Sequence, residues 1–169
     1  MKKILLLNDF VSRGKIAGHQ MNAILSYKDM DVFFLPTALI SNKFNLKKFD
    51  ILDTGDYISN SLKVWKELNI KFDAVFIGFI KNQKQKDIII DFIKSLDPET
   101  LIVLDPIMGD IGSLYSGLDQ SIISIYKEVM EYAHIILPNI TEAGLLCDKK
   151  TDHISPIWDI LSSKKRKVI

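Results

Sequence analysis

Apolar positions along the chain fall into two kinds of segment. Five short segments are almost continuously apolar, which is typical of strands covered on both faces of a sheet. They are KILLL (3–7), DVFFL (31–35), DAVFIG (73–78), LIVLD (101–105) and HIILP (134–138). Between them, apolar residues recur every third or fourth position, which predicts amphipathic helices. These helical stripes run from Ile58 to Leu68, from Ile89 to Leu96 and from Leu118 to Tyr132.

Strands that alternate with helices predict right-handed crossovers and a mostly parallel central sheet flanked by helices. The chain has 169 residues, of which 47% are hydrophobic, and this is enough to bury one sizeable core. It shows no repeat period and no linker rich in proline and glycine. We therefore expect a single three-layer α/β domain over residues 1–169.

The segment from Thr37 to Thr54 interrupts this alternation. Its sequence, TALISNKFNLKKFDILDT, has no clean helical period. It could project over the sheet edge as a lid or a small hairpin, or it could be an irregular surface connection, and periodicity alone favours the irregular connection. Thr54, Gly55 and Asp56 are expected to cap the helix that carries Trp65.

The last residues predict a further helix and the start of a strand. Apolar positions from Ile154 to Leu161 indicate the helix, and the four cations at 164–167 are favourable at its carboxyl end. The final KVI has the composition of a strand. We therefore expect the chain to stop within its fold, with the carboxyl-terminal part of the domain missing.

Charge and cysteine content narrow the class of protein. A formal net charge of +1 gives no reason to expect nucleic acid or a membrane as a partner. The single cysteine, Cys147, excludes an internal disulfide, and its apolar surroundings place it in the core. The apolar run near Met1 is too short for a signal peptide, and no run reaches membrane-spanning length. We expect a cytoplasmic protein.

Two polar motifs follow predicted strands, at the sheet edge where ligands of parallel sheets bind. In DPIMGD (105–110), Asp105 could hold Mg²⁺ or orient its water ligands, although the same residues also form turns. In PNITEAGLL (138–146), Asn139 and Glu142 have the spacing of a reciprocal helix cap. Glu142 could instead lie near a phosphate-bound Mg²⁺. Taken together, the two motifs favour a metal–phosphate site.

Other phosphate and metal motifs are absent from the sequence. Neither G-x-G-x-x-G nor G-x-x-x-x-G-K-[ST] occurs, so a dinucleotide fold or a Walker-type loop is not supported. Lys15 could neutralise a phosphate or simply be solvated. His19, His134 and His153 lack the spacing of metal ligands.

Five segments, in this order, resemble the pyridoxal (pyridoxine/pyridoxamine) kinases of the ribokinase-like superfamily. They are NDFVSRGKIAGHQMNAIL, LPTALISN, ELNIKFDAVFIGFI, LDPIMGD and LPNITEAGLL, and they extend from Asn8 to about Leu146. The pair DP-x-MGD and PN-x-TEA is fairly specific to these kinases and the related hydroxymethylpyrimidine kinases. The resemblance implies a ribokinase-like fold, transfer of the ATP γ-phosphoryl group to the 5′-hydroxyl of a B6 vitamer, Mg²⁺, commonly K⁺, and a homodimer.

The resemblance also implies two groups of site residues. Those on the ATP and phosphate side are Asp105, Leu137, Asn139 and Glu142, with Asp105 and Glu142 at the metal. Those near the B6 ring are Asp9, Phe44, Asn45, Gly78 and Phe79.

Two departures from the family pattern bear on function. Family members usually have S-x-H-T-G where this chain has SNKFN (41–45), so Lys43 and Phe44 replace a histidine and a threonine that touch the ring. Phe44 could stack on an aromatic substrate. The catalytic aspartate of the superfamily lies in a late G-x-G-D motif, which this sequence does not contain and which we expect beyond Ile169.

Three functions therefore stay open from the sequence. The first is a B6-vitamer kinase of which this chain alone transfers little phosphate, because the base and anion hole are needed for transfer. The second is a hydroxymethylpyrimidine kinase. The third is a non-catalytic remnant that binds a ligand or a partner chain.

Overall fold

The computed structural model describes residues 1–44, 48–148, 161–162 and 167–169, and these contain a seven-stranded sheet with the strand order β3-β2-β1-β4-β5-β8-β9. The strands are β1 (Lys3–Val11), β2 (Asp31–Ile40), β3 (Ile51–Asp53), β4 (Ala74–Ile77), β5 (Leu101–Leu104), β8 (Ile135–Ile136) and β9 (Lys167–Val168). All neighbouring pairs in this sheet are parallel except β2 and β3. The predicted mostly parallel α/β sheet is therefore confirmed.

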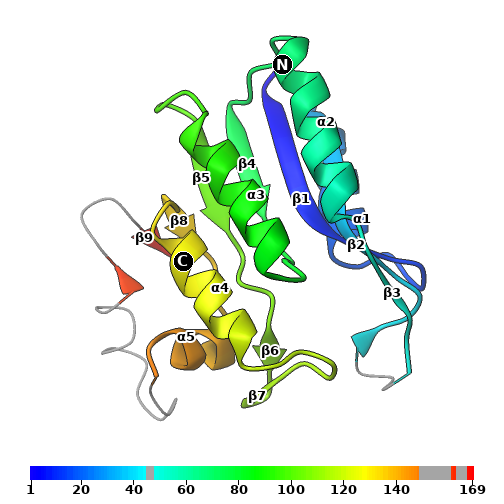
Figure 1. The fold of residues 1–169 in the computed structure, drawn as a ribbon, viewed down its shortest axis with the longest axis vertical. Helices are drawn as coiled ribbons and strands as arrows, with labels where there is room; N and C mark the ends of the chain where they lie inside the picture. The colour runs from blue at the N-terminus through cyan, green and yellow to red at the C-terminus, as the bar shows by residue number, and fades with distance from the viewer. Residues whose placement is uncertain (45–47, 149–160, 163–166) are drawn as a thin grey trace.

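Helices cover both faces of the sheet, as the alternation of segments predicts. They are α1 (Gly18–Tyr27), α2 (Gly55–Glu67), α3 (Gln83–Lys94), α4 (Ser121–Met130) and α5 (Ile140–Leu146). Helices α2, α3 and α4 lie side by side across one face, and α1 packs behind β1 and β2 on the other (Figure 1). None of the helices in the described ranges has the length and apolarity of a transmembrane span.

The core forms where the predicted apolar stripes of the helices meet the sheet. Leu5, Val75 and Leu104 of the central strands are buried, together with Ile58 of α2 and Ile89 of α3. Because these strands are covered on both faces, their sequences are apolar at nearly every position rather than at alternate ones. The core thus holds the strands in place and leaves their carboxyl ends to carry polar residues.

The segment between Thr37 and Thr54 contains a β-hairpin, which confirms the hairpin that the sequence left open and shows that the irregular connection favoured by periodicity alone is wrong. Strand β2 continues to Ile40, and β3 pairs back on it in antiparallel register, with Ala38 opposite Asp53 and Ile40 opposite Ile51. Ser41 and Asp50 close the pairing, since the Ser41 N–H donates to the Asp50 carbonyl at 2.9 Å. Residues 37–53 are called the edge hairpin below. Part of its loop, 45–47, lies outside the described residues.

A second, shorter hairpin follows β5. Strands β6 (Gly109–Asp110) and β7 (Ser113–Leu114) are antiparallel, and the two residues between them, Ile111 and Gly112, both have positive φ (50° and 77°). This is the backbone of a two-residue turn that matches the twist of a hairpin. A side chain at Gly109 would place its Cβ 2.5 Å from the Ser113 carbonyl oxygen, so the close pairing needs glycine there.

The structure tests part of what was predicted for the carboxyl-terminal residues 154–169. The predicted strand at KVI is confirmed, because β9 pairs in parallel with β8, placing Lys167 opposite Ile135. Most of the predicted helix at 154–161 and the cations at 164–166 lie outside the described residues. Cys147 is half-buried and packs against the main core, as predicted.

Candidate substrate and phosphate site

The carboxyl ends of four neighbouring strands meet at one edge of the sheet. Hydrogen bonds between adjacent strands extend to this edge: the Gly78 N–H donates to the Leu7 carbonyl (2.7 Å) and the Asp105 N–H donates to the Ile77 carbonyl (2.8 Å). The Leu137 N–H likewise donates to the Leu104 carbonyl (2.9 Å). The sheet therefore places the predicted residues after β4, β5 and β8 along the same edge as the end of β1.

Asp9, in β1, has a buried carboxylate that is incompletely satisfied. The residue is 4% exposed, and its Oδ1 has no hydrogen-bond partner among the described residues. Burial raises the pKa of its carboxyl to about 6, against the effect of a hydrogen bond that lowers it. A buried oxygen without a partner is costly and uncommon, so this atom is a candidate to bind a ligand donor.

Asp105 lies close enough to Asp9 for the two charges to interact. Burial, and then the charge of Asp9, raise the pKa of Asp105 to about 6. Its carboxylate accepts no hydrogen bond that lowers this pKa from within the described residues. Such a carboxylate is stabilised by a cation or a hydrogen-bond donor that approaches from the site.

Glu142, the third member of this group, belongs to α5. It is 3% exposed, and burial raises its pKa to about 7, with a further contribution from the charge of Asp105. Backbone N–H groups oppose this rise. The two residues predicted to share a metal–phosphate site thus interact electrostatically, while their role in metal binding stays a prediction.

The spacing of Asn139 and Glu142 forms the predicted reciprocal cap of α5. Asn139 Oδ1 accepts from the N–H groups of Thr141 (2.9 Å) and Glu142 (3.0 Å). Glu142 Oε2 accepts from the Asn139 N–H at 2.9 Å, and its Oε1 accepts from the Met108 N–H at 3.2 Å. Both oxygens of Glu142 therefore accept hydrogen bonds from backbone N–H groups, and the carboxylate joins the start of α5 to the loop after β5.

The same cap fastens the β6–β7 hairpin to α5. Asn139 Nδ2 donates to the Gly109 carbonyl at 2.8 Å, and Thr141 Oγ1 accepts from the Gly112 N–H at 2.9 Å. Sequence analysis did not single out Thr141, although it lies inside the PN-x-TEA motif. These bonds fix the position of the hairpin and of Tyr115, the residue that follows β7.

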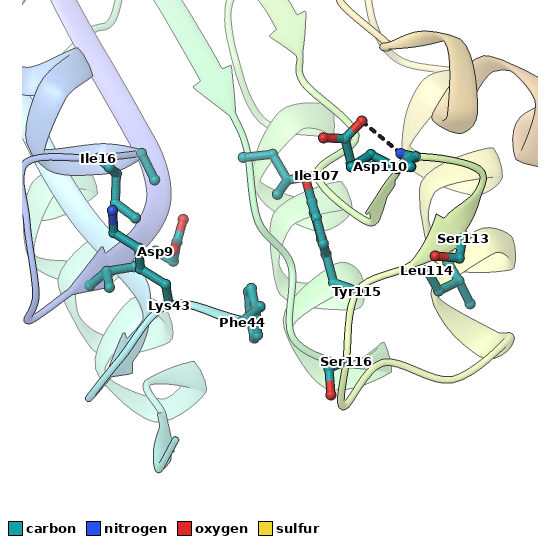
Figure 2. Close-up of a pocket in the computed structure, with 13 residues that line it drawn as sticks. Asp9, Ile16, Lys43, Phe44, Ile107, Asp110, Ser113, Leu114, Tyr115 and Ser116 are labelled. Atoms are coloured by element: carbon teal, nitrogen blue, oxygen red, sulfur yellow. Dashed lines mark hydrogen bonds between the residues drawn. The ribbon is translucent and has the colours of Figure 1, made fainter. Parts of the chain in front are cut away.

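A pocket of about 700 Å³ opens between the edge hairpin and the β6–β7 hairpin. Figure 2 shows Asp9, Lys43 and Phe44 on one side of it and Ile107, Asp110 and Tyr115 on the other. A pocket of this size, largely apolar with a few polar groups, suits a small organic ligand. The pocket lining therefore combines the buried carboxylate of Asp9 with an aromatic wall, which consists of the rings of Phe44 and Tyr115.

Phe44 is the centre of that wall. Its ring is nearly parallel to the ring of Tyr115, with 11° between planes and 5.9 Å between centroids. Behind it, the ring of Phe79 lies 5.6 Å away between centroids and is fully buried. Burial, and then nearby carboxylates led by Glu142, raise the pKa of Tyr115 to about 12, so its hydroxyl stays protonated and can donate.

Not all predicted ring residues reach the pocket. Asp9 and Phe44 line it, and Asn45 lies outside the described residues. Phe79 supports Phe44 from behind. Gly78 is required by packing, because an added Cβ would overlap Asn8 Oδ1, which accepts from the Phe79 N–H at 3.0 Å. Ile107 and Asp110 of the DPIMGD motif also line the pocket, and so does Tyr115, which sequence analysis did not name as a site residue.

Metal ligands are sparse at this edge. Within the described ranges, no group of three or more His, Cys, Asp and Glu side chains could hold a metal ion by itself. A cation here would need oxygens from a ligand or from water in addition to Asp105. Mg²⁺ bound to phosphates typically keeps such water ligands and uses one or two carboxylates, so the residues present fit that ion.

Comparison with known proteins places the chain among kinases. Residues 37–166 match a family described as phosphomethylpyrimidine kinase. A protein of Schizosaccharomyces pombe whose name assigns it to the pyridoxal kinases is 29% identical over 154 residues, which cover 87% of this chain and 44% of that protein.

Solved structures share the fold. A Bacteroides thetaiotaomicron protein assigned to the phosphomethylpyrimidine kinases, crystallised with pyridoxal, has a TM-score of 0.91 and 32% identity, covering 99% of this chain and 61% of that one. A pyridoxal kinase of Leishmania donovani, crystallised with ADP and pyridoxamine, has a TM-score of 0.80 over 93% of this chain and 56% of that one. Its 18% identity supports the fold alone. The chain thus spans between 44% and 61% of the length of these proteins.

Proposed function

The chain belongs to the phosphomethylpyrimidine kinase family, and from this premise we propose that its pocket binds the ring of a B6 vitamer for ATP-dependent phosphorylation of the 5′-hydroxyl. Pyridoxal, pyridoxine and pyridoxamine are the proposed substrates. The observation that carries the proposal is the buried Oδ1 of Asp9, which has no hydrogen-bond partner among the described residues and belongs to a residue that lines a pocket of about 700 Å³. Pyridoxal in the crystal of the Bacteroides relative supports it.

In this proposal, Asp9 recognises the polar rim of the ring. Above its pKa of about 6 the carboxylate is mostly ionised, and its free oxygen can accept a hydrogen bond from a protonated ring nitrogen or from a ring hydroxyl. Phe44 supplies an aromatic surface, which suits a planar ring. Gly78 and Phe79 act from outside the pocket lining. Gly78 leaves room for the side chain of Asn8, and the ring of Phe79 packs against Phe44.

The phosphate side of the proposal concerns Asp105 and α5. Asp105 would hold Mg²⁺ or its water ligands, while Glu142 would act on the same water network. Leu137 and Asn139 would lie beside the nucleotide. When bound, Mg²⁺ neutralises negative charge on the phosphates. The raised pKa of Asp105 fits a site whose charge is completed by a cation. K⁺, a homodimer and a cytoplasmic location belong to the same proposal.

Phosphoryl transfer requires more than this pocket. The sequence contains no G-x-G-D motif, in which related kinases carry the catalytic aspartate. We therefore keep the prediction that this chain alone transfers little phosphate.

A second candidate substrate is hydroxymethylpyrimidine, whose phosphate ester is the compound named in the description of the matching family. Like the B6 vitamers, it is a planar ring with nitrogen atoms and a hydroxymethyl group, so Asp9 and Phe44 could bind either. Comparison of the two ligands under the same conditions distinguishes these substrates.

Isothermal titration calorimetry of the chain tests the proposal. We expect pyridoxal to bind, and Asp9→Asn to weaken binding by about tenfold, because the amide cannot offer a charged acceptor. Asp91→Asn removes an exposed carboxylate elsewhere and serves as the matched control. Absence of pyridoxal binding, or equal affinity in wild type and Asp9→Asn, contradicts the proposal, and tighter binding of hydroxymethylpyrimidine favours the second candidate.

A further inference from the structure

Gln85, in the first turn of α3, is fully buried and joins three separate segments. Its Nε2 donates to the Thr37 carbonyl in β2 and to Asp53 Oδ1 at the end of β3, both at 2.7 Å. Its Oε1 accepts from the Lys81 N–H, in the segment after β4, at 3.0 Å. One side chain therefore links both strands of the edge hairpin to the start of α3.

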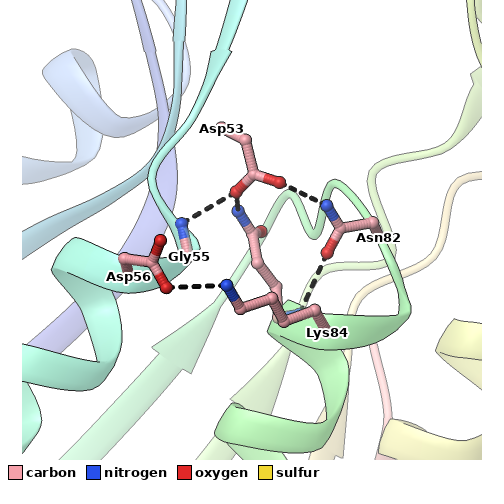
Figure 3. Close-up of polar contacts among 6 residues, drawn as sticks. Asp53, Gly55, Asp56, Asn82 and Lys84 are labelled. Atoms are coloured by element: carbon pink, nitrogen blue, oxygen red, sulfur yellow. Dashed lines mark hydrogen bonds and ion pairs between the residues drawn. The ribbon is translucent and has the colours of Figure 1, made fainter.

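The carboxylate of Asp53 accepts further hydrogen bonds beside the one from Gln85. Its Oδ1 also accepts from the Gly55 N–H (2.8 Å), and its Oδ2 accepts from Asn82 Nδ2 (Figure 3). Asn82 Oδ1 in turn caps α3 by accepting from the Gln85 N–H (3.0 Å). Although partial burial acts to raise the pKa of Asp53, these donors hold it below its usual value, so the carboxylate stays charged.

The edge hairpin has few other anchors at this end. Strand β3 has three residues and, in the part of the chain that the structure describes, pairs only with β2; its Leu52 and Asp53 are exposed. Thr54 is placed at the start of α2, but its Oγ1 donates to the Pro36 carbonyl (2.6 Å) instead of capping the helix. The attachment of β3 therefore depends on polar bonds more than on buried apolar area.

These bonds hold the base of the hairpin that carries two pocket residues. The edge hairpin carries Lys43 and Phe44, both of which line the pocket. Lys81, which Gln85 also holds, is two residues from Phe79, and the ring of Phe44 packs on Phe79. Gln85 thus fixes both the hairpin that carries Phe44 and the segment against which Phe44 packs.

We propose that Gln85 and Asp53 are positioning residues of the pocket, whose hydrogen bonds hold the edge hairpin on the start of α3 and so set the place of Phe44 and Lys43. A buried polar group that uses both of its donors and its acceptor favours one arrangement of the chain over others. The effect on ligand rests on the proposed function, whereas the attachment of the hairpin does not.

Gln85→Glu is the variant that separates this role from general packing. Glutamate has nearly the same shape and can still accept from the Lys81 N–H, but it cannot donate to Thr37 or Asp53 and brings a second negative charge to Asp53. The double variant Gln85→Glu/Asp53→Asn restores one donor opposite the new carboxylate. Lys84→Met is the matched control, since it removes the neighbouring exposed ion pair with Asp56 (2.6 Å; Figure 3) and leaves every hydrogen bond of Gln85 and Asp53 in place.

Hydrogen exchange followed by mass spectrometry measures the attachment. In Gln85→Glu we expect amides of 38–41 and 51–53 to exchange at least about tenfold faster, while those of β1 and β4 keep their wild-type rates. The double variant is expected to recover part of the protection, and Lys84→Met to match wild type. Unchanged exchange in the hairpin, or equal acceleration in all strands, overturns the proposal. If Gln85→Glu does not fold, the same comparison is made with Asp53→Asn, at an exposed position.

Pyridoxal affinity measures the consequence for the pocket. We expect Gln85→Glu to weaken binding by about tenfold and the double variant to recover part of it. A loosened hairpin with wild-type affinity overturns the positioning role. If wild type binds no pyridoxal, the proposed substrate is wrong, and the exchange rates still decide whether Gln85 and Asp53 hold the hairpin.

Discussion

The carboxylates of Asp9 and Asp105 interact electrostatically, although β4 separates the strands that carry them. Both side chains come from the carboxyl ends of parallel strands, and both are held in surroundings that raise their pKa to about 6. Glu142 adds a third such group with a pKa of about 7. Glu142 also caps α5, but burial of Asp9 and Asp105 near each other disfavours their ionisation, so this edge is where the structure most clearly favours binding of a ligand.

Asp105→Asn is expected to stabilise the ligand-free chain near neutral pH by about 1–2 kcal/mol, because it removes a carboxylate whose ionisation burial disfavours. The folded chain keeps a proton on Asp105 up to about pH 6, whereas the unfolded chain loses it near 3.8. Since the folded state then binds more protons, this group lowers stability as pH rises through that window.

Urea unfolding of wild type and Asp105→Asn, at about pH 4 and about pH 7.5, checks this prediction. The difference between the two proteins should be small at the lower pH and favour the variant at the higher one. The variant should also bind Mg–ATP more weakly than wild type. A variant that is less stable than wild type at both pH values contradicts the burial argument.

Pyridoxal affinity is expected to increase as pH rises from about 5 to about 7, because Asp9 must ionise to offer a charged acceptor. The inflection should lie near the pKa of Asp9, about 6. Asp9→Asn should remove this part of the pH profile, and the control Asp91→Asn should retain it. Calorimetry at a series of pH values gives the profile. A profile that is identical in wild type and Asp9→Asn would assign the titration to another group.

Regular elements and the cap of α5 could be predicted from the sequence because their signals are local. The apolar stripe around Ile58 reports its own burial, and the interval between Asn139 and Glu142 contains the whole capping box. The strand at KVI was also predicted, since Val168 belongs to a short apolar segment after a polar run. In each case the residues that decide the structure are neighbours in the chain.

The parts that sequence analysis left open or missed depend on distant residues. The edge hairpin pairs Ala38 with Asp53 and is held by Gln85, which lies more than thirty positions further along the chain. The β6–β7 hairpin turns at Ile111 with positive φ, where a β-branched residue gives no turn signal. Asp9 Oδ1 lacks a hydrogen-bond donor among the described residues, and a sequence pattern cannot show that a donor is missing.

Gly78→Ala is expected to destabilise the chain by about 2–4 kcal/mol, because the new methyl group would overlap the side chain of Asn8. Asn8 Oδ1 accepts from the N–H groups of Asp9 and Phe79, so a displaced Asn8 would also disturb the pocket wall. Gly112→Ala is the control: it meets open space and carries only the cost of positive φ, about 1 kcal/mol. Urea unfolding of both variants measures the difference. Gly78 is not among the glycines with positive φ, so equal losses at the two positions would contradict the argument from its contact with Asn8.

Asn139→Ala is expected to destabilise the chain by about 1–2 kcal/mol, because two N–H groups at the start of α5 lose their acceptor. Asn139→Asp is the matched variant, since it keeps the acceptor and the helix cap but loses the donor to the Gly109 carbonyl. It should retain most of the stability and yet loosen the β6–β7 hairpin. Thermal unfolding gives the stabilities, and hydrogen exchange of residues 109–115 gives the local effect. If Asn139→Asp protects the hairpin as well as wild type does, the bond to Gly109 does not hold it, and the contact between Gly112 and Thr141 is sufficient.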